Sequence, residues 1–141
     1  MEFEKAKEKA IAYLVRSRKT ENEVRIKLRK IGCSNEVEDQ VIEYIINLGY
    51  IDDQEYVDAY IRQCMRLQNY SIYEIKNKLL QKGIKKDIII SKLQELENTD
   101  YEKELVIKLL NGKLKNMDVL KQKQYLFRRG FKTGIQIIDE F

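Results

Sequence analysis

A phrase that recurs three times constrains the fold of this 141-residue chain more than any other feature. The segments LRKIG, LLQKG and LFRRG end at Gly32, Gly83 and Gly130, and an apolar residue follows each glycine. In each copy a leucine stands four residues before the glycine. A glycine just past a helix can adopt the left-handed backbone that ends the helix, while the next apolar side chain packs back on the last turn. The phrase therefore predicts three helix C-termini and structural roles for these glycines.

The residues twelve positions before these glycines predict where the same helices begin. Thr20, Ser71 and Asp118 are good N-cap residues, because their side-chain oxygens can accept a backbone N–H of the first turn. The first two are followed three residues later by a glutamate, which completes a capping box, whereas the third is followed by a lysine. The glycines are 51 and 47 residues apart. This cap-to-glycine pattern indicates an internal repeat.

Each repeat predicts a leading helix, the capped short helix and a closing helix. The leading helices are expected near residues 3–18, 53–67 and 100–111. The closing helices are expected to begin near Asn35, Asp87 and Thr133. Further start signals are pairs three residues apart: Asp52 with Glu55, Thr99 with Glu102, Asn35 with Glu38, and Thr133 with Gln136. The predicted repeats are residues 1–50, 51–98 and 99–141.

The absence of proline and the apolar spacing predict helices nearly throughout. The chain contains no proline, the residue that most often breaks a helix. Val57, Tyr60, Ile61 and Cys64 recur at the spacing of one helical face. Units of this length seldom bury enough apolar surface alone, so neighbouring units should pack end to end. The predicted fold is all-α, with three tandem three-helix repeats in an elongated, curved array.

The composition argues against an enzyme and against a bound cofactor. The chain has no histidine, the side chain that titrates near neutral pH and the commonest metal ligand, and no glycine-rich phosphate loop. The acidic residues at 36–39 and 52–55 fall where helices should begin, so Asp52 and Asp53 are expected to have structural roles there, with a cation site as the less favoured alternative. Two cysteines are too few for a disulfide framework, and no run approaches the ~20 apolar residues of a membrane helix. We therefore expect a cytoplasmic protein without membrane contact.

Basic residues are the candidate functional groups. Net charge is +1 for residues 1–50, −1 for residues 51–100 and +4 for residues 101–141, an asymmetry that suggests an anionic partner. Three basic residues stand seven positions before the repeat glycines, and others stand beside the last glycine. The candidate partner-binding residues are Arg25, Lys76, Lys123, Arg128, Arg129 and Lys132. These side chains form either a basic stripe along the array or only a solvated face.

Three segments resemble the RecX family, whose members regulate the RecA recombinase. The most specific is LGYIDDQEYVDAYIRQCMR, from Leu48 to Arg66. LLQKGI at 79–84 and YLFRRGF at 125–131 follow in the order that the family shows. The resemblance covers nearly the whole chain, and Tyr56-Val57 stands where family members often show Phe-Ala.

The resemblance implies a regulator without enzymatic activity and without cofactors. RecX-like proteins bind RecA and its nucleoprotein filament, lie along the filament groove and inhibit strand exchange, ATP hydrolysis and coprotease function. The implied partners are therefore RecA and its filament on single-stranded DNA, with weak direct DNA binding as a possibility, and we expect a monomer. The alternative is a DNA-binding protein of the helix-turn-helix type, because each capped helix is followed by a glycine turn and a further helix.

Overall fold

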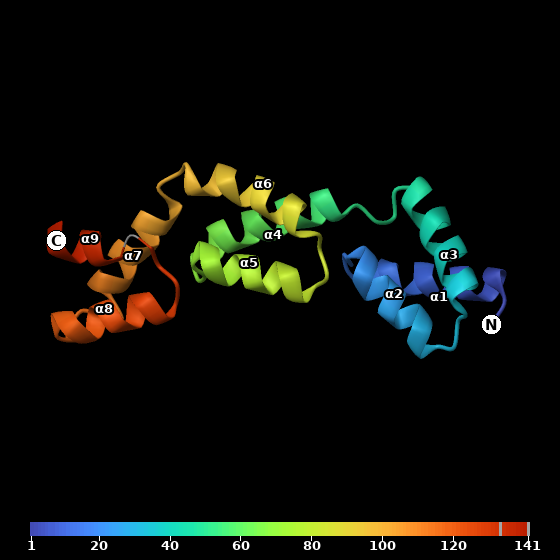
Figure 1. Ribbon diagram of the computed structural model, residues 1–141, viewed down its shortest axis with the longest axis horizontal. Coiled ribbons are helices and arrows are strands. Elements are labelled where there is room, and N and C mark those ends of the chain that lie inside the picture. Colours follow the sequence, from blue (N-terminus) through green and yellow to red (C-terminus); the bar gives the residue numbers. More distant parts are fainter. Residues whose placement is uncertain (133, 141) are drawn as a thin grey trace.

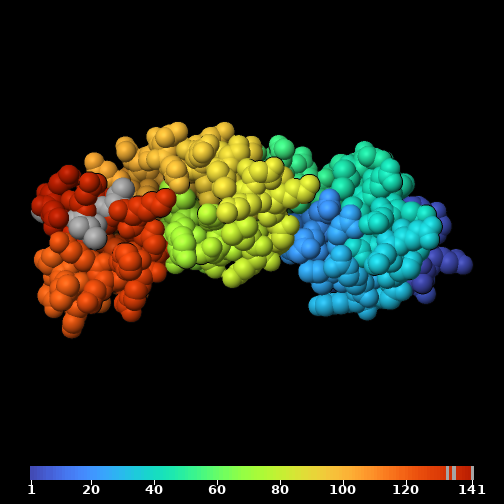
Figure 2. All heavy atoms as spheres, in the orientation of Figure 1, coloured from blue at the N-terminus to red at the C-terminus, as the bar shows by residue number. Residues whose placement is uncertain are grey.

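The computed structural model describes residues 1–132 and 134–140, with the backbone alone for Ile135. Every regular element among these residues is an α-helix. The helices are α1 (Phe3–Arg16), α2 (Glu21–Lys30), α3 (Asn35–Asn47), α4 (Asp53–Leu67), α5 (Ile72–Gln81), α6 (Lys86–Glu97), α7 (Tyr101–Asn111), α8 (Val119–Arg128) and α9 (Gly134–Glu140). They form an elongated, gently curved row with the N-terminus at one end and the C-terminus at the other (Figure 1, Figure 2).

The helices lie along the row in three consecutive groups, α1–α3, α4–α6 and α7–α9 (Figure 1). The all-α prediction and the array of three three-helix repeats are confirmed. Two predicted ends were slightly wrong: α1 stops at Arg16 because Ser17 is extended, and α7 begins one residue late, at Tyr101.

The short helices α2, α5 and α8 begin and end as the repeated phrase predicts. The Thr20 and Ser71 hydroxyls each accept the N–H three residues on, and both capping boxes are complete. The Asp118 carboxylate accepts the Lys121 N–H at 2.9 Å. At the other end, the residue after each glycine donates its N–H to the carbonyl of the repeated leucine, for example Phe131 to Leu126 at 3.0 Å.

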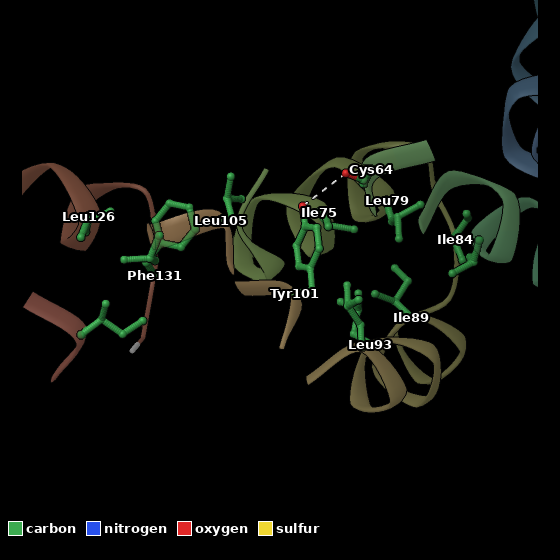
Figure 3. Close-up of a cluster of buried hydrophobic side chains, with 14 of the residues drawn as sticks. Cys64, Ile75, Leu79, Ile84, Ile89, Leu93, Tyr101, Leu105, Leu126 and Phe131 are labelled. Atoms are coloured by element: carbon green, nitrogen blue, oxygen red, sulfur yellow. Dashed lines mark hydrogen bonds between the residues drawn. The ribbon is translucent and has the colours of Figure 1, made fainter. Parts of the chain in front are cut away.

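Buried side chains gather in two clusters that divide the row unequally. One cluster lies within the first group of helices and includes the fully buried Leu28 and Val41. The other runs without interruption through the second and third groups, from Tyr56 to Ile137. Figure 3 shows Tyr101 in the middle of this second cluster, with its hydroxyl directed toward the Cys64 carbonyl at 3.5 Å. The second and third groups therefore share one core, whereas the first has its own.

The predicted pairs of residues at helix starts form caps in some cases and not in others. Asp52 caps α4 as expected, accepting the Glu55 N–H at 3.1 Å. The Asn35–Glu38 prediction was wrong, because Ser34 caps α3 and the Glu38 side chain turns inward to two arginines. The Thr99–Glu102 prediction was correct only in part. The Thr99 hydroxyl accepts the N–H of Tyr101, the first residue of α7, at 3.3 Å, but the Glu102 carboxylate bonds to the N–H groups of Ile72 and Lys132 instead. The predicted Thr133–Gln136 box lies outside the described residues.

Candidate functional site

The two junctions between consecutive groups use the same chemistry at the start of a short helix. The buried hydroxyl of Thr20, before α2, donates to the Lys82 carbonyl oxygen at 2.9 Å. The buried hydroxyl of Ser71, before α5, donates to the Arg129 carbonyl oxygen at 2.6 Å. Lys82 and Arg129 are the C-caps of α5 and α8. Each hydroxyl therefore caps its own helix and also fastens that helix to the end of the next short helix.

Glycine at the end of α5 and α8 allows these helix ends to approach so closely. A Cβ built on Gly83 would lie 2.5 Å from the Asn22 Cβ, and one built on Gly130 would lie 2.6 Å from the Tyr73 Cβ. Gly32, at the free end of the row, has no described atom within 4 Å of its Cβ position. All three glycines have positive φ, at 94°, 79° and 83° in chain order.

At each junction a carboxylate from the first turn of the next unit's leading helix, α4 or α7, adds further hydrogen bonds. Asp53 accepts the Glu21 N–H at 3.0 Å. Glu102 accepts the Ile72 N–H at 3.2 Å and the Lys132 N–H at 3.1 Å. Burial raises the pKa of Asp53 and of Glu102 above the ordinary values, against the effect of these hydrogen bonds. Each carboxylate thus receives the N–H of the first residue of the preceding unit's short helix, Glu21 or Ile72, which that helix leaves unpaired, and Glu102 also receives one N–H from its own unit.

An ion pair crosses each junction, but the pair at the first, Arg18 with Glu55 at 3.5 Å, is exposed, whereas the pair at the second is shorter and more buried. The Arg129 guanidinium donates to the Glu74 carboxylate, with Nη2 and Oε1 at 2.8 Å, and to the Asn69 carbonyl oxygen at 2.6 Å. Burial alone would raise the pKa of Glu74, but Arg129 and the Ser71 N–H more than offset it, so this pKa lies below its usual value. Together with the shared core, this network makes the second junction the more extensively bonded of the two.

Each junction is flanked by a groove, and the walls of the two grooves come from equivalent elements. The groove at the first junction measures about 480 Å³ and the groove at the second about 690 Å³. Arg25 and Lys85 line the first groove, and Lys76 and Lys132 occupy the equivalent places in the second. The array therefore repeats a polar groove of similar construction along its length.

Arg25, the first of the six predicted partner-binding residues, is engaged within its own unit. Its guanidinium lies 2.7 Å from the Asp39 carboxylate, 3.0 Å from Glu38 and 3.2 Å from Glu21. Partial burial would lower its pKa, but the hydrogen bonds to these carboxylates raise it. Arg25 therefore stabilises the contact between α2 and α3.

The other predicted cations are placed less uniformly than the repeat suggests. Lys76 and Lys132 line the larger groove. The Lys123 ammonium lies 2.9 Å from the Asp139 carboxylate on α9. Arg128 is exposed and forms no ion pair with a described residue, whereas its neighbour Arg129 is part of the second junction. Two of the six residues, Lys76 and Lys132, thus share the larger groove, and three, Arg25, Lys123 and Arg129, are occupied by internal ion pairs.

No group of three acidic, cysteine or histidine side chains lies close enough to hold a metal ion in the described part of the chain. Cys33 is half-buried and Cys64 is buried. Burial raises the pKa of the Cys64 thiol to about 11, so the thiol stays protonated at neutral pH. Among residues 1–132 and 134–140, the helices are all too short or too polar to span a membrane.

Comparisons with known proteins agree with this architecture. A family model described as the first three-helix domain of RecX matches residues 6–44, and one described as the second matches residues 52–91. The regulatory protein RecX of Prosthecochloris aestuarii is 31% identical over an alignment of 147 positions, which covers 96% of this chain and 93% of that protein. The chain belongs to the RecX family.

Other RecX proteins show the extent of the likeness. The crystal structure of RecX from Lactobacillus salivarius is 29% identical and has a TM-score of 0.79, with 98% of this chain and 92% of that chain covered. The regulatory protein RecX of Clostridium acetobutylicum is 32% identical over an alignment of 136 positions, which covers 89% of this chain. The alignment covers 63% of the Clostridium protein, so the chain spans less than two thirds of that relative.

Sequence reasoning missed the residues that join one RecX unit to the next. It assigned Thr20 and Ser71 to capping alone, although the hydroxyl also bonds the following unit. A signal was present: the two caps that precede another unit are hydroxyl residues, whereas the last cap, Asp118, is a carboxylate. A carboxylate cannot donate to a carbonyl oxygen, so the bond that joins the other units cannot form at Asp118.

The buried Glu38 carboxylate makes the stability of this RecX chain depend on pH. Hydrogen bonds from Arg29, and then from Arg25, lower the pKa of Glu38 in the folded state. Its stabilising contribution is therefore complete above the ordinary glutamate pKa near 4.5 and is lost as the pH falls through the lower, folded value. Glu38→Gln should lower the free energy of unfolding by about 2 kcal/mol at pH 7, because two arginines lose their carboxylate.

Urea unfolding at pH 7 and at pH 3.5 tests this assignment. The difference between wild type and Glu38→Gln should shrink at the lower pH, because the Glu38 carboxylate of the unfolded chain, with the ordinary pKa near 4.5, is largely protonated there. Glu36→Gln, an exposed neighbour on the same helix, is the control and should change stability little at either pH. A Glu38→Gln protein as stable as the control at pH 7 contradicts the assignment.

Proposed function

We propose that this chain binds the RecA recombinase, alone and as its filament on single-stranded DNA, and inhibits its ATPase, strand-exchange and coprotease activities without being an enzyme itself. Membership of the RecX family supports the proposal, since the relatives are named regulatory proteins. In this proposal the chain is a cytoplasmic monomer of three units, residues 1–50, 51–98 and 99–141, that acts in recombination, DNA repair and the SOS response.

The repetition of the junction is the observation that carries the proposal. The same hydroxyl-to-carbonyl bond, glycine contact and carboxylate contact recur between consecutive units. Fixed junctions hold equivalent surfaces in a fixed order along an elongated body, which suits a polymer whose subunits also recur regularly. Several weak contacts on one body raise the effective concentration of the next, so the array can bind more tightly than one unit.

The contact residues are proposed from charge and availability. Lys76 and Lys132 line the larger groove, and Arg128 is exposed on the last unit. Lys123 can exchange its exposed partner Asp139 for a partner carboxylate at small cost, because surface ion pairs contribute little. Arg25 and Arg129 serve the proposal indirectly: Arg25 holds α2 to α3 within the first unit, and Arg129 holds the third unit to the second.

The RecA ATPase on single-stranded DNA is the direct test. Adding the chain at substoichiometric amounts should lower the steady-state rate, because one bound array contacts several subunits. A parallel titration of fluorescent single-stranded DNA without RecA tests the helix-turn-helix alternative. Tight binding to bare DNA that weakens steeply with salt, together with an unchanged ATPase rate, favours that alternative and contradicts the proposal.

A further inference from the structure

The surface at the start of α8 is equivalent to the two surfaces that receive a following unit. Thr20 and Ser71 are completely buried in their junctions, whereas Asp118, at the same place in the last unit, is exposed. Leu120 stands two residues after its cap, as do Asn22 and Tyr73, which lie against Gly83 and Gly130 in the two junctions. Unlike a side chain in a junction, Leu120 has no described glycine of a following unit against it and is 66% exposed. The last unit therefore presents a docking surface that no described residue covers.

This surface continues along α8 as an exposed apolar stripe. Leu120 and Phe127 are seven residues apart, so they lie on one side of the helix about two turns from each other. Phe127 is 76% exposed and Val119 is 54% exposed. Exposed large apolar side chains that gather on one face are typical of a binding surface.

The net positive charge of the chain comes from the segment that contains α8, residues 112–132. Residues 112–132 carry one carboxylate, Asp118, and seven cations. The cations are Lys113, Lys115, Lys121, Lys123, Arg128, Arg129 and Lys132. The rest of the chain has 20 basic and 22 acidic residues. Lys121 and Arg128, each next to a residue of the apolar stripe, form no ion pair with a described residue. A partner for this face should therefore combine apolar and acidic side chains.

A second copy of the chain does not fit this face. In head-to-tail stacking, the Asp118 carboxylate would face the carbonyl oxygen of Ile31, where the internal junctions have a hydroxyl donor. Lys121 would face the Ile31 side chain, where Glu74 meets the Arg129 guanidinium in the second junction. Both polar contacts would be lost, and two oxygens would be brought together.

Single-stranded nucleic acid fits less well than protein. Bases stack on aromatic or guanidinium planes, whereas two of the three exposed apolar residues, Val119 and Leu120, are aliphatic. The exposed Asp118 at the start of the stripe repels phosphate groups. Aliphatic and aromatic side chains flanked by cations favour an acidic, partly apolar segment of a protein.

We propose that the α8 face, defined as Val119, Leu120, Lys121, Phe127 and Arg128, binds an acidic segment with exposed apolar side chains on the partner protein. This inference rests on the proposed function, in which that partner is RecA in its filament. Leu120 and Phe127 fill apolar positions on the partner, and Lys121 and Arg128 pair with its carboxylates. The face gives the array a third contact besides the two junction grooves.

The test is the affinity of Leu120→Ser/Phe127→Ser for RecA filaments on single-stranded DNA, measured by fluorescence with a labelled chain. Both residues are exposed, so the helical signal and Tm should stay unchanged while the affinity falls about tenfold or more, as for the central residues of an interface. Val15→Ser/Leu67→Ser, which replaces two exposed apolar residues of other helices, is the matched control and should bind like wild type. Lys121→Glu/Arg128→Glu should also weaken binding.

The possible failures point to different errors. If wild type does not bind the filament, both the proposed function and the assignment of the α8 face as a binding surface are contradicted. If wild type binds and Leu120→Ser/Phe127→Ser binds equally well, the α8 assignment alone is overturned. The α8 assignment is also overturned if the variant loses affinity for bare single-stranded DNA to the same degree as for the filament, because the face then binds nucleic acid. It is overturned as well if wild type self-associates in sedimentation and the variant does not, because the face then binds a second copy of the chain.

Discussion

Gly130→Ala is expected to destabilise the chain by about 3 kcal/mol, because the new methyl group meets two obstacles at once. A left-handed backbone, here with φ of 83°, costs a residue with a Cβ about 1 kcal/mol. The added Cβ would also lie 2.6 Å from the Cβ and ring of Tyr73 in the preceding unit. The two units must separate to admit it, and overpacking of this kind costs about 1–3 kcal/mol. Thermal or urea unfolding measures the loss.

Gly32→Ala is the matched control for this prediction. Gly32 ends the equivalent helix with the same sign of φ, but no described atom lies within 4 Å of its Cβ position. The control should therefore lose only the backbone component, about 1 kcal/mol. Equal losses in the two variants would falsify the claim that Gly130 is required by the contact between units.

The helices themselves were predictable because their signals are local. A cap, a leucine four residues before a glycine, and an apolar residue after it all act within one or two helical turns. Thr20 and Ser71 were assigned correctly as caps for this reason. Asn35 was assigned wrongly because Ser34, one residue earlier, is also a good cap, and Glu38 had a stronger partner than the free backbone.

The junctions were not predictable in the same way, because their partners lie far apart in sequence. Thr20 bonds a carbonyl 62 residues away, and Glu74 pairs with an arginine 55 residues away. Charge alone gave Arg128 and Arg129 the same predicted role, although one is exposed and the other is part of a junction. Residue type predicts that a cation prefers an anion, but not whether that anion belongs to the same chain.

These two neighbours therefore supply the second large prediction. Arg129→Glu should destabilise the chain by about 2–3 kcal/mol, at the lower end of the cost of breaking a buried ion pair, because both partners keep some contact with water. The new carboxylate would face Glu74, and the carbonyl of Asn69 would lose its donor. The capping box at Ser71 would weaken too, since Glu74 also accepts the Ser71 N–H at 2.9 Å.

Arg128→Glu makes the same change of charge one residue away and separates binding from stability. Arg128 is exposed and forms no ion pair with a described residue, so its variant should unfold within about 0.5 kcal/mol of wild type. We expect it to inhibit the RecA ATPase less while keeping its Tm, whereas Arg129→Glu should lose Tm first and inhibition as a consequence. Calorimetry and the ATPase assay on both variants measure this. If Arg129→Glu keeps the wild-type Tm, its guanidinium does not hold the second junction. The fixed spacing of units, on which the proposed filament binding depends, must then come from the shared apolar core.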